Sequence, residues 1–384
     1  MKVVFISSWW PTSIHPTNGN FVYKHARTVA QNHELVVVHV QHDRDLSGKR
    51  FAVIHRKTKH FVEIIVSYGW GRGAPKPLNF LLRILAYCRG LKRVVDTFGR
   101  PDLIHAHVML DAGIAAYCFA WLSNLPFLIS EHSTLYIERN NLPFVQRMLT
   151  RWVGQRAGAI LPVSAYLAER MQRTHGIKGR FQVLSNVVND QVFYPGEEKV
   201  SGRTFRLLHV STLRDEQKNF TGLLSAFAKV NRSYPGEFSL DIISEGELET
   251  AIRYSERMGI GEDAVFFTGT SSEAAIAARM RQSDALVLYS HFETQGVVVI
   301  EALCSGLPCI VSDIRPLKDM VVHRKDGLVV KAGSPKSLAS AIVEAKKTSA
   351  SYDRLAISER ARKKYSEKII GKVLDKIYRS TVCR

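Results

Sequence analysis

Short apolar runs alternate with helical patterns along the whole chain, and this alternation constrains the fold more than any other feature. Short apolar strands that are separated by helices favour parallel sheets whose two faces are both covered. We therefore predict an α/β protein. The predicted strands lie at Val3–Ile6, Leu35–Val40, Leu103–Ala106, Phe127–Ser130, Ile160–Val163, Leu207–Val210, Leu240–Ile243, Val265–Phe267, Ala285–Leu288 and Cys309–Val311.

The chain is longer than one hydrophobic core usually supports. At 384 residues it is expected to form two domains of roughly 150–200 residues each. A polar stretch that contains Pro, Gly and Ser, residues 193–203, is typical of a linker, so we place the boundary near residue 198. The predicted domains are thus 1–198 and 199–362. The remaining segment, 363–384, has helical periodicity and is predicted to be a C-terminal helix.

The net charge of +18 and the pI near 9.7 indicate an anionic partner, because nucleic acids, anionic membranes and phosphorylated substrates all attract basic proteins. The basic residues do not interleave with aromatic residues in the pattern of a known nucleic-acid module, so no nucleic acid is expected. Residues 79–95 have the pattern of a basic amphipathic helix. Either this helix packs on a sheet and exposes its basic face to solvent, or that face contacts anionic lipid headgroups.

The compartment is predicted from cysteines and apolar runs. Five cysteines are scattered without metal-ligand spacing, which fits a reduced compartment. No apolar run approaches the ~18–20 residues of a membrane span. The apolar stretch at the N-terminus is too short for a signal peptide. We therefore expect a cytoplasmic protein, with the inner face of the cell membrane as a further location.

Two glutamates, Glu293 and Glu301, bracket the glycine that begins an apolar helical segment. This segment is apolar on nearly every side, which predicts a buried helix, and a buried glutamate is costly unless a partner satisfies it. Gly306 and Pro308 end the helix before the next strand. The segment therefore carries charge at the edge of a sheet, where open α/β folds bind ligands.

Polar residues also follow strands in the first half of the chain. Gly19 and Asn20 precede a predicted helix, where backbone amides can approach an anion, and a plain turn is the alternative. His107 and His132 follow two neighbouring strands. Each is either a hydrogen-bonded scaffold residue or a residue of the ligand-binding edge.

The chain resembles the retaining GT-B glycosyltransferases of family 4, the glycosyl transferases group 1, over nearly its whole length. The segment from Glu293 to Glu301 is similar to that family's signature of two glutamates separated by seven residues, although Thr294 and Gln295 stand where its members more often have Gly and Phe. The resemblance implies two Rossmann-like parallel-sheet domains that face each other across an interdomain cleft. It also implies that the segment 363–384 crosses back onto the N-terminal domain.

Roles for individual residues follow from the same resemblance. Glu293 is expected beside the donor hexose, Glu301 at the ribose hydroxyls, and His132 at the hexose beside the reaction centre. Lys218 and Arg214, which would otherwise be read as solvated loop residues, are expected to bind the donor diphosphate. Further implied donor contacts are made by Gly19, Asn20, Thr294, Gln295, Gly296 and Val297.

The function that the resemblance implies is transfer of a hexosyl-type group, with retention, from a UDP- or GDP-linked sugar to a glycan or lipid-linked saccharide acceptor. The pathway would be synthesis of cell-surface polysaccharide or glycolipid, without a metal or other cofactor and with contact to an anionic membrane. Three alternatives stay open. They are another GT-B enzyme such as a sugar epimerase or phosphorylase, a dinucleotide oxidoreductase, whose glycine fingerprint is lacking after the first strand, and a non-catalytic polyanion-binding protein.

Overall fold

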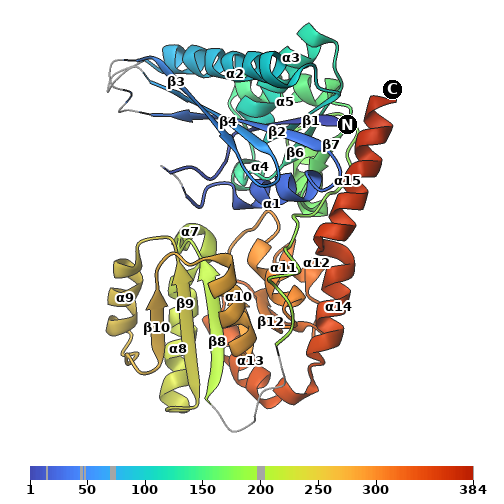
Figure 1. Ribbon diagram of the computed structural model, residues 1–384. Coiled ribbons are helices and arrows are strands. Elements are labelled where there is room, and N and C mark those ends of the chain that lie inside the picture. Colours follow the sequence, from blue (N-terminus) through green and yellow to red (C-terminus); the bar gives the residue numbers. More distant parts are fainter. Residues whose placement is uncertain (14–15, 44–45, 47–48, 70–74, 197–203, 384) are drawn as a thin grey trace. The chain divides into compact units, whose positions relative to one another are not determined.

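The computed structural model describes residues 1–383 apart from 14–15, 44–45, 47–48, 70–74 and 197–203 (Figure 1). The chain divides into two compact units. The first consists of Met1–Val187 and Ile370–Arg384, and the second of Val188–Ile369. The boundary that we placed near residue 198 lies outside the described residues, and the division in the structure falls between Val187 and Val188.

The first unit is built on a seven-stranded sheet with the order β3-β4-β2-β1-β5-β6-β7. All neighbouring strands are parallel except β3 and β4, which are antiparallel. The strands are β1 Lys2–Ser7, β2 Glu34–His42, β3 Phe51–Lys57, β4 Val62–Tyr68, β5 Leu103–His107, β6 Phe127–Glu131 and β7 Ile160–Pro162.

Helices cover both faces of this sheet because successive strand residues point to opposite sides. Val4 and Ile6 pack in the cluster that includes α2, α3 and α5, whereas Val3 and Phe5 pack with α1 and α15. The helical elements are α1 Asn20–Val29, α2 Lys76–Phe98, η1 Met109–Gly113, α3 Ile114–Ser123, α4 Leu135–Glu138, α5 Phe144–Arg156, α6 Ala165–Glu169, η2 Arg170–Thr174 and α15 Glu367–Val382.

The second unit contains a six-stranded parallel sheet with the order β10-β9-β8-β11-β12-β13. Its strands are β8 Phe205–Ser211, β9 Phe238–Ser244, β10 Val265–Thr268, β11 Ala285–Leu288, β12 Cys309–Ser312 and β13 Gly327–Val330. Its helical elements are α7 Asp215–Lys218, α8 Phe220–Ser233, α9 Leu248–Arg257, α10 Glu273–Gln282, α11 Val297–Cys304, α12 Leu317–Met320, α13 Pro335–Lys347, η3 Ser349–Ser351 and α14 Arg354–Tyr365.

The apolar helix α11 is buried, as its sequence predicts. Its side chains share one core cluster with the sheet on one side and with Ile357, Ala361 and Tyr365 of α14 on the other. Ser358 Oγ of α14 donates to the carbonyl of Cys304 at 2.6 Å, which ties the two helices together. The sequence predicts that α11 is buried but does not predict that α14 is the helix that covers it.

Two Rossmann-like units with parallel sheets confirm the predicted fold class, and each predicted strand is present. The sequence did not predict β3, β4 or β13, and α2 is longer at both ends than the predicted 79–95 segment. Strand β3 pairs antiparallel at the sheet edge and is mostly exposed, and its apolar run is limited to residues 51–54 before three polar residues. Within the described part of the chain, no helix is long and apolar enough to cross a membrane.

Candidate active site

In the second unit, the loops after β8 and β11 bring the two central site residues together. The Lys218 ammonium lies 2.6 Å from Glu293 Oε1, and both side chains are largely buried. Ser290 Oγ donates to the same carboxylate oxygen at 2.8 Å. The peptide N–H of His291 donates to the carbonyl of Gln217 at 2.8 Å, so the two loops are joined through their backbones as well.

The loop that carries Lys218 is tightly braced. Thr221 donates to the Asp215 carboxylate from its N–H at 2.9 Å and from its hydroxyl at 2.8 Å, which closes the α7 turn. Leu213 has a left-handed backbone with φ 54°, and its N–H donates to Ser211 Oγ at 3.1 Å. The left-handed region is uncommon for a non-glycine residue and gathers at functional sites.

His209 supports this loop from the interior of β8. Its Nδ1 lies 2.9 Å from the carbonyl of Val287, and its Nε2 lies 2.7 Å from Ser211 Oγ. Burial lowers the pKa of His209 to about 4, so the ring is neutral at pH 7. Because a carbonyl can only accept, Nδ1 carries the proton and Nε2 accepts from Ser211. Sequence reasoning missed this role, which only the strand register reveals.

The start of α11 supplies backbone groups beside Glu293. Gly296 precedes the helix with φ 93°, and a Cβ there would lie 2.7 Å from Leu317 Cδ2, so only glycine fits without a shift. Gln295 is buried and Thr294 is half-buried. The first turn, from Val297, points the positive end of the helix dipole toward the strand edge. Glu301 is buried within the same helix.

Arg214 is placed differently from Lys218. It is exposed at the position before α7, and its guanidinium forms no hydrogen bond or ion pair with any residue that the structure describes. The structure therefore brings Lys218 and Glu293 into contact but not Arg214. Its predicted contact with a diphosphate stays a prediction.

The first unit gathers histidines at the ends of β5 and β6. His107 Nδ1 lies 3.2 Å from His132 Nε2, and the two rings are stacked. His105 Nδ1 lies 2.7 Å from the Tyr378 hydroxyl of α15, and its Nε2 lies 2.8 Å from Ser130 Oγ. Burial lowers the pKa of His105, His107 and His132 well below the usual value, so all three rings are neutral at pH 7.

Glu131 organises the turn that carries His132. Its carboxylate accepts three backbone N–H groups, from Met109, His132 and Ser133, each at 2.8 Å. Burial raises the pKa of Glu131 to about 7, and the three hydrogen bonds act against that rise. The neighbouring Val108 has φ 79° and ψ 126°, a rare conformation for a β-branched residue. Neither Glu131 nor Val108 was predicted as part of a site.

Gly19 caps the start of α1, as expected for the first polar loop. Its φ is 74°, and a Cβ would collide with the carbonyl oxygen of Trp9, so a side chain is excluded there. Asn20 is the first, exposed residue of α1. The predicted site residues thus form two groups, with Gly19, Asn20 and His132 in the first unit and the others in the second.

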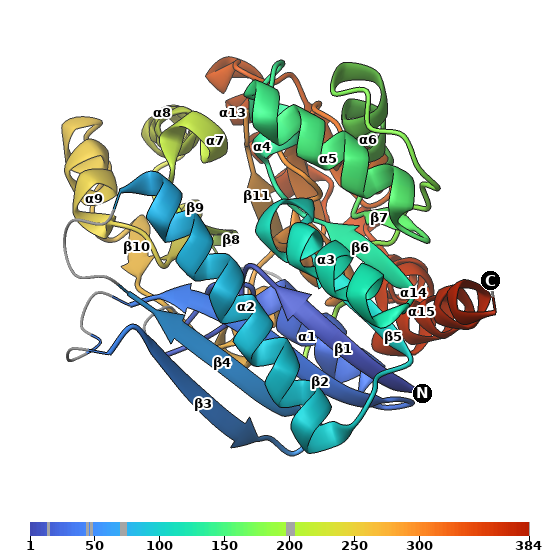
Figure 2. The same ribbon diagram turned by 90° about the horizontal axis from the view of Figure 1, so that it is seen from above.

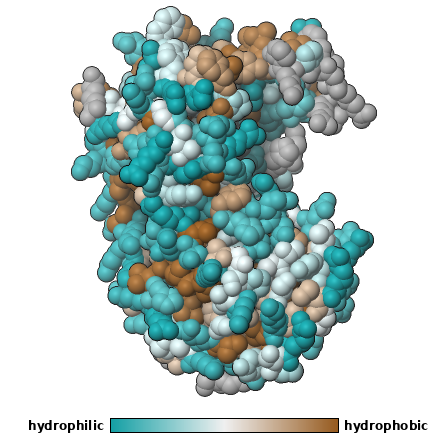
Figure 3. Space-filling view, turned by 180° about the vertical axis from the view of Figure 1, so that it is seen from behind, coloured by the Kyte–Doolittle hydropathy of each residue, from teal (hydrophilic) through white to brown (hydrophobic). Residues whose placement is uncertain are grey.

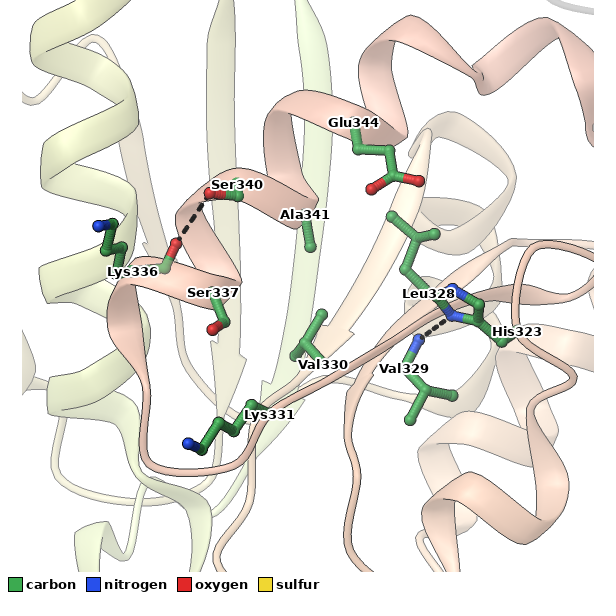
Figure 4. A pocket seen from close by; sticks show the side chains of 10 residues that line it. All are labelled: His323, Leu328, Val329, Val330, Lys331, Lys336, Ser337, Ser340, Ala341 and Glu344. Atoms are coloured by element: carbon green, nitrogen blue, oxygen red, sulfur yellow. Dashed lines mark hydrogen bonds between the residues drawn. The ribbon is translucent and has the colours of Figure 1, made fainter.

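A separate open cavity of about 390 Å³ lies in the second unit between β13 and α13 (Figure 4). Lys331, Lys336, His323 and Glu344 are among its lining residues. His323 is turned toward the strand, where its Nδ1 accepts from the N–H of Val329 at 3.1 Å. None of the predicted site residues lines this cavity.

Among the described residues, no group of three or more His, Cys, Asp or Glu side chains is arranged to hold a metal ion. The chain contains one Asp-x-Asp triplet, Asp43-Arg44-Asp45, which follows β2 in the first unit. Residues 44 and 45 of this triplet lie outside the described residues. The expectation of a reaction without a metal stays a prediction.

Two family profiles match the chain, one for each half. The profile described as "Glycosyltransferase Family 4" matches residues 19–192, and the one described as "Glycosyl transferases group 1" matches residues 193–364. The architecture and these matches define a glycosyltransferase with the GT-B fold. The chain belongs to the glycosyl transferases group 1.

Individual relatives are distant. The chain is 25% identical over 287 residues to a glycogen synthase of Mycobacterium tuberculosis, covering 73% of this chain and 68% of that protein. The sucrose-phosphate synthase of Thermosynechococcus elongatus is similar in structure, with a TM-score of 0.79, 17% identity, and coverage of 99% and 98%. Anabaena Alr3699/HepE in complex with UDP has a TM-score of 0.75, 16% identity, and coverage of 99% and 100%.

Proposed function

We propose that this glycosyltransferase moves a hexosyl-type group from a nucleotide diphosphate sugar, UDP- or GDP-linked, to a glycan or lipid-linked saccharide. The observation that carries the proposal is the buried Lys218–Glu293 pair at the start of α11. A cation, a carboxylate and a helix N-terminus at one strand edge suit a ligand that combines a diphosphate with sugar hydroxyls. The similar structure of Anabaena Alr3699/HepE, which was determined in complex with UDP, supports this donor class.

In the proposed complex, Lys218 turns from Glu293 to the diphosphate and neutralises the charge that develops on the leaving group. Glu293 then accepts hydrogen bonds from hexose hydroxyls, while Glu301 accepts from ribose hydroxyls. The amides of Gln295 to Val297 and the guanidinium of Arg214 complete the anion contacts. His132, which is neutral, contacts the hexose beside the reaction centre.

The proposed reaction retains the anomeric configuration by attack on the same face. The bond from the anomeric carbon to the phosphate oxygen breaks, and a bond to the acceptor oxygen forms. The acceptor proton passes to the departing phosphate oxygen, so the step needs no side-chain nucleophile and no metal. Retention of configuration and independence from a metal both stay proposals. Synthesis of cell-surface polysaccharide or glycolipid on the inner side of the cell membrane is the setting that we propose.

The test is a binding panel followed by product analysis. UDP, GDP and ADP and their hexose conjugates would be titrated by calorimetry, and we expect one base to bind. Turnover with that donor, in buffer with a chelator, should give a product whose anomeric configuration matches the donor by NMR. Absence of binding by every sugar nucleotide would refute the proposal. An inverted product would refute retention alone, and loss of turnover with the chelator would refute only metal independence.

A further inference from the structure

Three helices of the first unit form one outer layer on the same face of its sheet. Helices α2, α3 and α5 lie side by side over that face (Figure 2). The rings of Tyr117 on α3 and Trp152 on α5 have centroids 4.2 Å apart, which joins these two helices. Ala86 of α2 and Ala116 of α3 belong to the same buried cluster, so the layer is continuous beneath its surface.

The outer surface of this layer exposes large apolar side chains. Trp121 is 72% exposed, Phe144 is 69% exposed and Leu81 is 53% exposed. These are high fractions for residue types that are usually buried. The space-filling view in Figure 3 shows hydrophobic side chains among hydrophilic ones on the first unit. We call the exposed residues of this layer the outer-helix surface: Leu81, Leu85, Trp121, Leu122, Phe144 and Met148.

Basic side chains lie between these apolar ones. The Arg156 guanidinium lies 4.6 Å from the Trp152 ring centroid, and that of Arg147 lies 5.9 Å from the Phe144 ring centroid. Lys92 and Arg93 are exposed on α2. The sequences of α2, α3 and α5 contain a single acidic residue, Asp96. The surface is therefore both apolar and strongly positive.

We propose that the outer-helix surface docks the protein on an anionic lipid bilayer. Aliphatic and aromatic side chains enter the boundary between headgroups and acyl chains, while Arg and Lys pair with phosphate. A polynucleotide would use the charge and the rings but would leave Leu81, Leu122 and Met148 in water. The inference identifies the surface that makes the membrane contact and does not depend on sugar-nucleotide binding.

The surface differs from the one that the sequence suggested. The basic helix pattern at 79–95 contains Leu81 and Leu85 but not the most exposed aromatic residues. Trp121 and Phe144 come from α3 and α5, and only the packing of those helices beside α2 places them on one face. The alternative, in which α2 only exposes a basic face to solvent, does not account for the exposed tryptophan and phenylalanine next to it.

The test is co-sedimentation of the full chain with phosphatidylglycerol–phosphatidylcholine vesicles and with phosphatidylcholine vesicles. We expect binding to the anionic vesicles that weakens with salt, and little binding to the neutral ones. Lys92→Glu with Arg93→Glu should weaken binding about tenfold or more. Trp121→Ser with Phe144→Ser should reduce quenching of tryptophan fluorescence by brominated lipid, with Trp152 as the remaining reporter in this layer. Thermal melting confirms that each variant is folded.

Matched controls exist on the same chain. Lys372→Glu with Lys376→Glu makes the same charge change on α15, which covers the other face of the sheet, and both lysines are exposed. Leu355→Ser removes an exposed leucine from α14. Equal binding to both vesicle types, no binding to either, or equal losses in the controls would overturn the proposal. So would self-association through this face, or binding to a polynucleotide alone.

Discussion

Lys218 Nζ and Glu293 Oε1 lie 2.6 Å apart although 75 residues separate them in the chain, and Ser290 holds the same oxygen. A pair this buried is stable only while both charges are present, because each would otherwise lose solvation without compensation. A ligand can separate the two only if it offers an anion to the lysine and hydrogen-bond donors to the glutamate. A sugar diphosphate offers both.

Replacing Lys218 should therefore damage stability and turnover together. Lys218→Ala is expected to lower the free energy of unfolding by about 3 kcal/mol, since Glu293 remains buried without its partner. Turnover should fall by orders of magnitude, and Glu293→Ala should have a similar effect on turnover. Chemical unfolding and initial rates measure the two effects. Adding Glu293→Gln to Lys218→Ala should recover stability but not turnover.

Lys229 provides the control for that experiment. It is exposed on α8 of the same unit. Lys229→Ala should leave both measurements unchanged. If Lys218→Ala instead turns over at the wild-type rate, the assignment of Lys218 to the diphosphate is wrong.

Gly296 should tolerate no side chain. Gly296→Ala combines a positive φ of 93° with a contact of 2.7 Å to Leu317, so we expect a loss of about 2 kcal/mol or more in unfolding free energy and weaker donor binding. Gly236→Ala separates the two causes, because Gly236 has φ 74° and nothing within 4 Å of the added Cβ. It should lose only about 1 kcal/mol. Equal losses in the two variants would show that the Leu317 contact is irrelevant.

The second unit should lose stability in acid through His209. Its folded pKa of about 4 lies below the usual 6.5, so the unfolded chain binds more protons between these values and stability falls as the pH drops through them. The loss below pH 4 amounts to about 3 kcal/mol at most. Unfolding measured across this pH range should show a smaller acid-dependent loss for His209→Gln than for wild type. His60→Gln, at an exposed histidine, should retain the wild-type dependence.

Tyr378 should anchor the C-terminal helix within the first unit. Its hydroxyl lies 2.7 Å from His105 Nδ1, and both residues are fully buried. Tyr378→Phe leaves a buried nitrogen without its partner, so we expect about 1–2 kcal/mol less stability and faster proteolysis of α15. Tyr234→Phe, at an exposed tyrosine, is the control. Unchanged proteolysis of α15 would contradict the anchoring role.

His132 should matter for turnover more than for folding. His132→Asn is expected to lower turnover strongly while keeping most of the unfolding free energy, because asparagine can still hydrogen-bond to His107. Initial rates at saturating donor, together with thermal melting, separate the two. A stability loss that is larger than the loss of turnover would assign His132 to the scaffold instead.

Local features of this protein were predictable from sequence. The apolar runs marked the central strands, and the glycines at 296 and 306 marked the ends of α11, because side-chain periodicity and glycine conformations act over a few residues. The weaker signals failed: β3 is an exposed edge strand, so its side chains carry no burial pattern. Leu213 and Val108 adopt left-handed conformations that no local residue preference predicts.

The residue types at the site were also evident from sequence, with a glutamate before the glycine that starts α11 and a lysine in the loop after β8. Only the tertiary structure decided that these two neutralise each other, that His209 braces the loop that carries Lys218, and that α14 closes over α11. The reason is that strand order and register determine which loops meet, and these depend on the packing of the whole sheet. The exposed basic and apolar side chains of the outer helices likewise form one surface only after α2, α3 and α5 have packed side by side.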